Sequence, residues 1–161
     1  MNVVDRSAPP PRPRRIIPLL APLYDALTPL TVPMIRLTAG LLLLPHGCQK
    51  LFGWFGGKGM AGTAAYFASA GFEPGYFWAL LVALTETVGG LCLAVGFLTR
   101  PAAAAIAVFM AVAVIETHWP KGFFWTSGGF EYPLMWGIVA LAFVIRGGGR
   151  YSVDGVIGRE F

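Results

Sequence analysis

Charged residues are scarce in this sequence. Asp, Glu, Lys and Arg together make up 12% of its 161 residues, whereas hydrophobic residues make up 56%. A soluble domain usually carries roughly 25% charged residues. The deficit excludes an ordinary soluble domain and indicates a membrane protein whose surface faces the lipid bilayer.

Cysteine and histidine are also scarce, with two of each. Cys48 and Cys92 form no CxxC or CxxxC pair, so neither a zinc site nor a disulfide framework is indicated. The two histidines leave the ligand set of a haem incomplete, and we expect no metal and no intrinsic cofactor. The net charge of +4 does not indicate nucleic acid, because no basic stripe with interleaved aromatic residues lies outside the apolar segments.

Long apolar segments, in contrast, make up most of the chain. A bilayer crossing takes about 20 residues, and four segments approach or reach that length: residues 33–52, 76–98, 102–116 and 130–145. The fold class we expect is all-α, a four-helix transmembrane bundle formed by residues 33–150. We expect residues 1–32 to form a Pro/Arg-rich tail and an interfacial segment, because prolines interrupt their apolar run. Residues 151–161 are expected to form a cytoplasmic C-terminal tail.

The connections between the segments predict the orientation. Residues 53–75 hold a short helix-forming stretch with Gly71 as its cap, which we expect at the membrane interface. Residues 99–101 predict a tight turn, because a residue before proline avoids helical geometry. Nine of the twelve Lys and Arg residues lie on the side of this turn and of the termini. Since Lys and Arg gather on the cytoplasmic side, we expect a multi-pass protein of the bacterial inner membrane with both termini in the cytoplasm.

Five ionisable residues inside or at the ends of the apolar segments are the candidate ligand-binding residues: His46, Lys50, Glu86, His118 and Glu131. A charge at membrane depth costs about 2.5–3.5 kcal/mol on insertion scales, so such residues are rarely without a role. His46 and Lys50 are four residues apart and share a helix face. Counted from the outer ends of their segments, all five lie in the outer half of the bilayer, where we expect a polar pocket.

Glycines mark the faces of the first two segments that we expect to touch. Gly40 and Gly47 lie on one helical stripe with Lys50, and Gly90 lies on a stripe with Glu86. Small residues let two helix backbones approach closely. Contact between these stripes would bring Glu86 toward the basic residues of the first segment.

Two interpretations of this pocket carry equal weight. In one, it binds a small molecule. A quinone head group would suit it, because histidine can donate to a carbonyl and a carboxylate or histidine can move protons. In the other, a Glu–Lys or Glu–His pair neutralises itself and fixes the packing of the helices.

Five sequence pieces in a fixed order carry a resemblance to a known family. They are RLTAGLLLLPHGCQKLFGWFGGKG, GTAAYFASAGF, ETVGGLCLAVGFLTRPAA, HWPKGFFWTSGGFEYPL and GGGRYSVD. Across residues 34–154, the chain resembles the DoxX family of small four-helix membrane proteins. The family positions fall on Arg36, His46, Gly47, Lys50, Glu86, Gly90, Arg100, Glu131 and Asp154.

The resemblance implies a four-helix transmembrane bundle linked to a redox membrane complex. Members of this family serve as subunits of thiosulfate:quinone oxidoreductase in some archaea and as membrane partners of thiol-redox and superoxide-defence proteins in some bacteria. Our first hypothesis is a membrane subunit of a redox assembly, quinone-linked if it is catalytic. Its partners would be the lipid bilayer and either another protein or a second copy of this chain.

Two further hypotheses stay open. The chain has no recognisable cofactor motif and no dithiol pair, which favours a non-enzymatic anchor or scaffold for a partner protein. The other is a small transporter component, which is the weakest of the three because the four segments show no inverted repeat.

Overall fold

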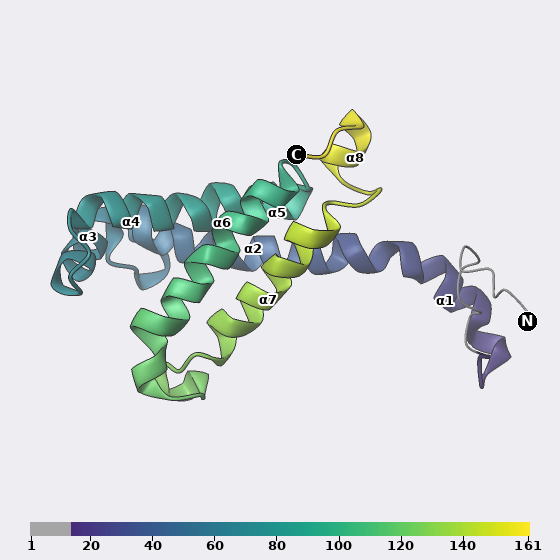
Figure 1. The fold of residues 1–161 in the computed structure, drawn as a ribbon, viewed down its shortest axis with the longest axis horizontal. Coiled ribbons are helices and arrows are strands. Elements are labelled where there is room, and N and C mark those ends of the chain that lie inside the picture. Colours follow the sequence, from purple (N-terminus) through teal and green to yellow (C-terminus); the bar gives the residue numbers. More distant parts are fainter. Residues whose placement is uncertain (1–13) are drawn as a thin grey trace, which may run out of the picture.

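The computed structural model describes residues 14–161, and all regular structure in this range is helical (Figure 1). The helices are α1 Ala21–Leu27, α2 Thr31–Phe52, α3 Gly59–Ser69, α4 Gly75–Leu84, α5 Gly90–Val95, α6 Thr99–Val112, α7 Glu131–Arg146 and α8 Val153–Ile157. Two π-helical segments, Thr85–Gly89 and Ala113–His118, continue α4 and α6 without a break. Short 3₁₀ turns lie at Pro18–Leu20, Thr28–Leu30, Trp54–Gly56, Trp119–Lys121 and Trp125–Ser127. The all-α prediction is confirmed over this range, and most of the expected tail, residues 1–13, lies outside it.

Three helical stretches within residues 14–161 are long and apolar enough to cross a membrane: Pro18–Phe52, Gly75–Val95 and Thr99–Lys121. They correspond to the first three expected segments. Helix α7 matches the fourth in position, but it has 16 residues, which rise about 24 Å. A bilayer core is roughly 30 Å thick, so length alone does not make α7 a crossing.

Prolines begin helical segments at two places where we expected them to interrupt or end one. The first long stretch starts at Pro18, well before residue 33, and α6 starts at Thr99, where we predicted a tight turn. Pro18 and Pro101 lie in the first turn of their segments, where a missing N–H would have no helical partner anyway. The turn prediction was wrong by a few residues, because the chain reverses at Gly96 and Leu98, which both have positive φ.

The expected glycine contact between the first two segments is confirmed. Helix α2 packs against α4, the following π segment and α5. A Cβ atom on Gly40 would lie 2.6 Å from the Ala94 amide nitrogen, and one on Gly47 would lie 2.9 Å from the Thr87 nitrogen. Real Cβ atoms essentially never approach backbone so closely. The packing distance between α2 and the second segment therefore requires glycine at positions 40 and 47.

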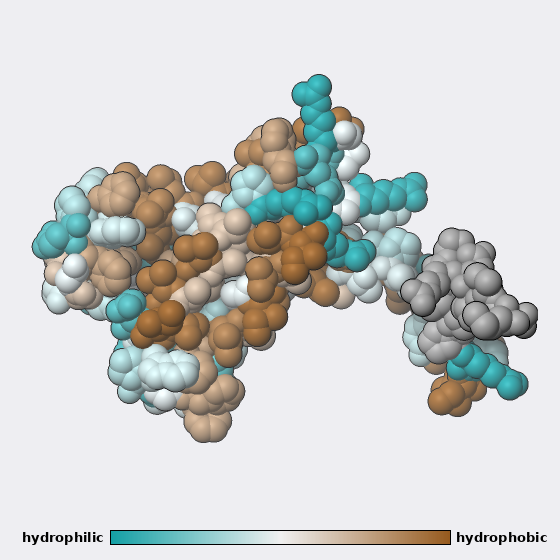
Figure 2. Space-filling view, in the orientation of Figure 1, coloured by the Kyte–Doolittle hydropathy of each residue, from teal (hydrophilic) through white to brown (hydrophobic). Residues whose placement is uncertain are grey.

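The core lies where α2, α5, α6 and α7 meet. Leu43, Leu93, Ile106, Ala140 and Phe143 are buried there. The outer faces of the helices are apolar as well, and Figure 2 shows hydrophobic surface spread over α4, α6 and α7. Exposed apolar surface of this extent marks contact with a membrane or another protein. Together with the three stretches long enough to cross a membrane, this surface indicates a membrane protein.

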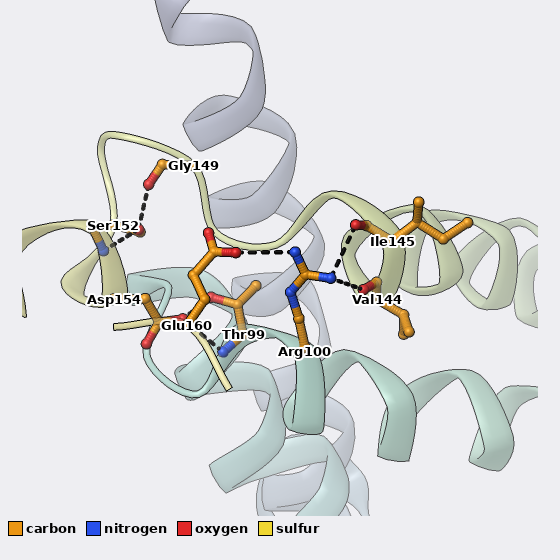
Figure 3. A network of polar contacts seen from close by, with 9 residues as sticks. Thr99, Arg100, Val144, Ile145, Gly149, Ser152, Asp154 and Glu160 are labelled. Atoms are coloured by element: carbon orange, nitrogen blue, oxygen red, sulfur yellow. Dashed lines mark hydrogen bonds and ion pairs between the residues drawn. The ribbon is translucent and has the colours of Figure 1, made fainter. Parts of the chain in front are cut away.

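A buried carboxylate joins α8 to the start of α6 at the end of the molecule that carries the C-terminus (Figures 1 and 3). Asp154 accepts hydrogen bonds from the N–H groups of Leu98 and Thr99, both at 2.9 Å, and from the Thr99 hydroxyl at 2.6 Å. Burial tends to raise the pKa of Asp154, but these hydrogen bonds and the charge of Arg36 lower it more, to below its ordinary value of 3.8. The carboxylate supplies from α8 the cap that α6 lacks locally.

Two arginines hold the segment after α7 against this end. Arg36 of α2 is 3% exposed and donates to three carbonyl oxygens: Ala94 at 3.3 Å, Tyr151 at 2.7 Å, and Gly148. Arg100 of α6 donates at 3.1 Å to two carbonyls in the last turn of α7, those of Val144 and Ile145. It also pairs with Glu160 at 3.0 Å (Figure 3). The motif residues Arg36, Arg100 and Asp154 therefore act in assembly of the fold.

Candidate functional site

The opposite end of the bundle contains a cavity of about 840 Å³. Figure 1 shows the α6–α7 pair diverging from α2 and α4 toward the end where α3 lies. The cavity is lined by residues of α2, α3, α4 and α6 with the π segments that follow the last two, and α7, together with the two loops at this end. Aromatic residues form much of its wall: Tyr66, Phe67, Phe109, Trp125, Tyr132 and Trp136.

An ion pair between α2 and the first π segment forms the polar centre of the cavity wall. The Lys50 Nζ lies 2.6 Å from Glu86 Oε2 and 2.8 Å from Glu86 Oε1, so it bridges both carboxylate oxygens. The Glu86 side chain is 5% exposed, whereas that of Lys50 is 26% exposed. The third contact of Nζ is long, 3.4 Å to the His46 carbonyl oxygen. Lys50 thus keeps one weakly used donor beside the cavity.

Glu86 lies within the first π segment, Thr85–Gly89. Thr85 and Thr87 flank Glu86, and their hydroxyls donate to the carbonyls one turn earlier, those of Leu81 at 2.8 Å and Ala83 at 2.7 Å. Hydroxyls that bond to the preceding turn disturb regular helical pairing. A π turn shifts the residues after it relative to an α-helix and is frequent at functional sites. The flanking threonines were the sequence signal for this segment, and our reasoning did not use it.

Histidines line both sides of the cavity. His46 precedes Lys50 by one helical turn and is exposed at the cavity, and its ring makes no hydrogen bond within residues 14–161. His118 closes the second π segment, and its Nδ1 lies 2.6 Å from the Gly128 carbonyl oxygen. A carbonyl can only accept, so Nδ1 carries the proton and Nε2 of the neutral ring is left as an acceptor. The His46 imidazole therefore has no partner in the described chain, and the His118 imidazole is oriented by the Gly128 carbonyl.

Glu131 does not line the cavity. Its carboxylate accepts a hydrogen bond from the Trp125 N–H at 2.7 Å and holds the loop before α7. Sequence reasoning also missed polar and charged residues that do line the cavity: Gln49, Lys58, Thr63, Thr117 and Tyr132. Gln49 directly precedes Lys50 on α2, and Tyr132 follows Glu131 in the first turn of α7, but our candidates were limited to Lys, His and Glu residues within or at the ends of the apolar segments.

The cavity therefore combines an apolar aromatic wall with a few polar groups of defined character. Lys50 can donate hydrogen bonds, the two histidines can donate or accept them, and Glu86 is a carboxylate next to a cation. Among residues 14–161 no group of three or more His, Cys, Asp or Glu side chains is placed to hold a metal ion. The arrangement suits an uncharged, flat molecule with carbonyl or hydroxyl groups.

Comparisons with known proteins agree on the type of protein. The DoxX family model matches residues 31–119, which include His46, Lys50, Glu86 and His118 but not α7. A protein of Bacillus subtilis (strain 168) named "Putative oxidoreductase CatD" is 28% identical over 109 residues, which cover 68% of this chain and 75% of that protein. No solved structure matches the chain.

Proposed function

Because this chain belongs to the DoxX family of membrane proteins, we propose that it is the membrane subunit of a redox assembly and binds a quinone head group in the cavity between α2, α6 and α7. The cavity carries the proposal. Its volume of about 840 Å³ falls within the roughly 300–1,000 Å³ of small-molecule sites. The oxidoreductase name of the relative supports a redox role.

The residues of the cavity fit a quinone head group. Lys50 can turn its weakly used donor from the His46 carbonyl to a carbonyl of the ligand. The unpartnered His46 ring can donate to the same group or take a proton from it, and His118 can accept from a hydroxyl through Nε2. The aromatic wall would stack against the ring and exclude water. A bound quinone supplies two-electron, two-proton chemistry, with a partner redox protein as the other electron carrier.

The proposed setting is a four-helix bundle in the bacterial inner membrane with both termini in the cytoplasm. The bias of nine basic residues against three supports this orientation. Helix α7 would be the fourth crossing, extended by the aromatic loop before it and by Arg146 at its other end. Aromatic rings and arginine at helix ends are typical of membrane interfaces, and they allow a short helix to cross by local thinning of the bilayer.

Purification in a mild detergent, followed by mass spectrometry of bound lipids, quinones and proteins, is the first experiment. We expect a quinone to co-purify. Quinones quench tryptophan fluorescence, and Trp125 and Trp136 line the cavity, so titration with a short-chain quinone should give saturable quenching. His46→Ala should weaken binding at least several-fold, whereas Glu116→Gln, at an exposed residue outside the lining, should not.

Two results would reject the quinone assignment. One is a folded protein that carries no quinone and shows no saturable quenching. The other is equal weakening by His46→Ala and Glu116→Gln. A second protein that co-purifies without any quinone would favour the anchor function instead.

A further inference from the structure

A second cavity lies at the opposite end of the molecule, where the C-terminus is. Its volume is about 650 Å³, and it lies between the N-terminal helical stretch and the segment after α7. Three arginines line it, Arg15, Arg146 and Arg150, together with the single acidic residue Asp25. We propose that this cavity binds the phosphate of an anionic phospholipid.

The charges in the cavity do not cancel. Arg15 pairs with Asp25, with Nη1 at 3.1 Å from Oδ2, which leaves two positive charges on the other wall. Neither the Arg146 nor the Arg150 side chain donates a hydrogen bond or joins an ion pair within residues 14–161, and the Arg150 guanidinium only lies over the Tyr151 ring at 5.7 Å. Arginine presents a planar fork of donors that matches phosphate oxygens. Two guanidinium groups without hydrogen-bond partners in the described chain, on one cavity, form a binding site for an anion.

The backbone between the two arginines keeps them on the same cavity. Gly147 and Gly149 have positive φ values of 76° and 71°, which favour glycine because they lie in the left-handed region. The carbonyl of Gly148, between them, is held by the buried Arg36. The turn is thus fastened to α2 rather than free to move. Arg146 and Arg150 are therefore positioned by the core of the fold.

The apolar surfaces beside the cavity favour a lipid over a free anion. The surface of α7 just before Arg146 is apolar and open, with Ile138 60% and Ile145 73% exposed. Arg146 follows at the point where this lipid-facing surface ends. On the other wall, Met34 of α2 is 62% exposed next to the lining residues Val32 and Pro33. A phosphate between the arginines would leave acyl chains against these apolar faces, as basic pockets at helix ends do with anionic lipids.

The test uses the full chain in a mild detergent and compares two lipids with the same acyl chains. Dioleoylphosphatidylglycerol is anionic, and dioleoylphosphatidylcholine is its zwitterionic control. We expect native mass spectrometry and thermal melts to show tighter binding of the first. A basic residue near an anionic lipid surface contributes about 1 kcal/mol, or about fivefold in affinity. Arg146→Gln with Arg150→Gln should therefore weaken phosphatidylglycerol binding about 25-fold by the same estimate.

Arg159→Gln is the matched control, because Arg159 is an exposed arginine of the same tail outside the lining. It should leave lipid binding unchanged. The lipid-free melting temperature of the double variant should match that of the parent, since neither arginine is bonded within the described chain. Equal binding of the two lipids, or equal weakening by Arg159→Gln, would overturn the proposal. So would stabilisation by inorganic phosphate alone with no effect of phosphatidylglycerol, which would make the source a free anion.

Discussion

Removing the charge of Lys50 should destabilise this protein more than removing that of Glu86. Lys50→Met leaves a carboxylate whose side chain is only 5% exposed without its cation, and breaking a buried pair in this way costs about 3–5 kcal/mol. Glu86→Gln leaves an ammonium that is 26% exposed and can be solvated from the cavity. A group left with incomplete hydrogen bonds costs about 1–3 kcal/mol.

The double variant measures the contact itself. With both charges removed no buried charge is left unpaired, so the cost should fall to about 2 kcal/mol or less, because apolar replacement of a whole pair is often neutral. The coupling, which is the sum of the two single costs minus the cost of the double variant, is then at least about 2 kcal/mol and about 4 kcal/mol at the central values, at or above the upper end for residues in contact. Thermal or denaturant melts of the four purified proteins in detergent give this value.

The exposed pair between Arg100 and Glu160 provides the control cycle. Its side chains are 37% and 42% exposed, and a surface pair contributes about 0–1 kcal/mol. If the effects of Lys50→Met and Glu86→Gln simply add, the two side chains are not in contact, and this would contradict the described cavity wall.

If the effects couple, quinone binding by the double variant separates a ligand-binding role of the pair from a packing role. Loss of quinone from a stable double variant supports a binding role, and retention of quinone leaves the pair a structural one.

Three further predictions test the fold around the site. Gly40→Ala should destabilise the protein by more than about 2 kcal/mol, because its methyl group would overlap the Gly90 carbonyl. Gly89→Ala is the control and should melt at the temperature of the parent, because its Cβ meets nothing nearer than 3.8 Å. Asp154→Asn should cost about 1–3 kcal/mol, because an amide cannot accept all three hydrogen bonds. Since the pKa of Asp154 is depressed in the folded state, its contribution is complete above the ordinary pKa of 3.8 and is lost as the pH falls through the lower folded value. Melts of the parent and of Asp154→Asn between neutral and acid pH should therefore converge at acid pH, and parallel curves would contradict this. A fluorescent reporter fused to the C-terminus should be active and a periplasmic phosphatase fusion at the same point inactive, and the reverse pattern would refute the proposed topology.

The contact between the first two segments was predictable because it depends on helical periodicity alone. Gly40 and Gly47 recur on one face of α2 with Lys50, and the same rule places Gly90 near Glu86. Small residues and opposite charges on matching stripes leave few other ways to pair two helices in a bilayer. The core of the cavity wall therefore followed from the order of residues within two segments.

The remaining walls depend on geometry that periodicity does not contain. The two π segments change the phase of their helices, so residues after them no longer follow the 3.6-residue count. Glu131 lies at the start of the fourth apolar segment, where a residue could line the cavity. Its carboxylate instead accepts a hydrogen bond from the Trp125 N–H and holds the loop. The contacts of Arg36 join residues 58 to 115 positions apart in the chain. Those of Asp154 join residues 55 or 56 positions apart. A single sequence does not determine contacts of that separation.

The contrast between the two ends of the bundle bears on the meaning of the Lys50–Glu86 pair. At the terminal end, Asp154 is 3% exposed, and all of its acceptor contacts are with groups of the protein. A pair that served packing alone would be expected to be closed in the same way, since partly satisfied buried polar groups are costly. Lys50 instead faces a cavity of about 840 Å³ with one long, weak contact, next to a histidine ring that has no partner in the described chain. A bilayer protein keeps such groups open where something enters to bond with them.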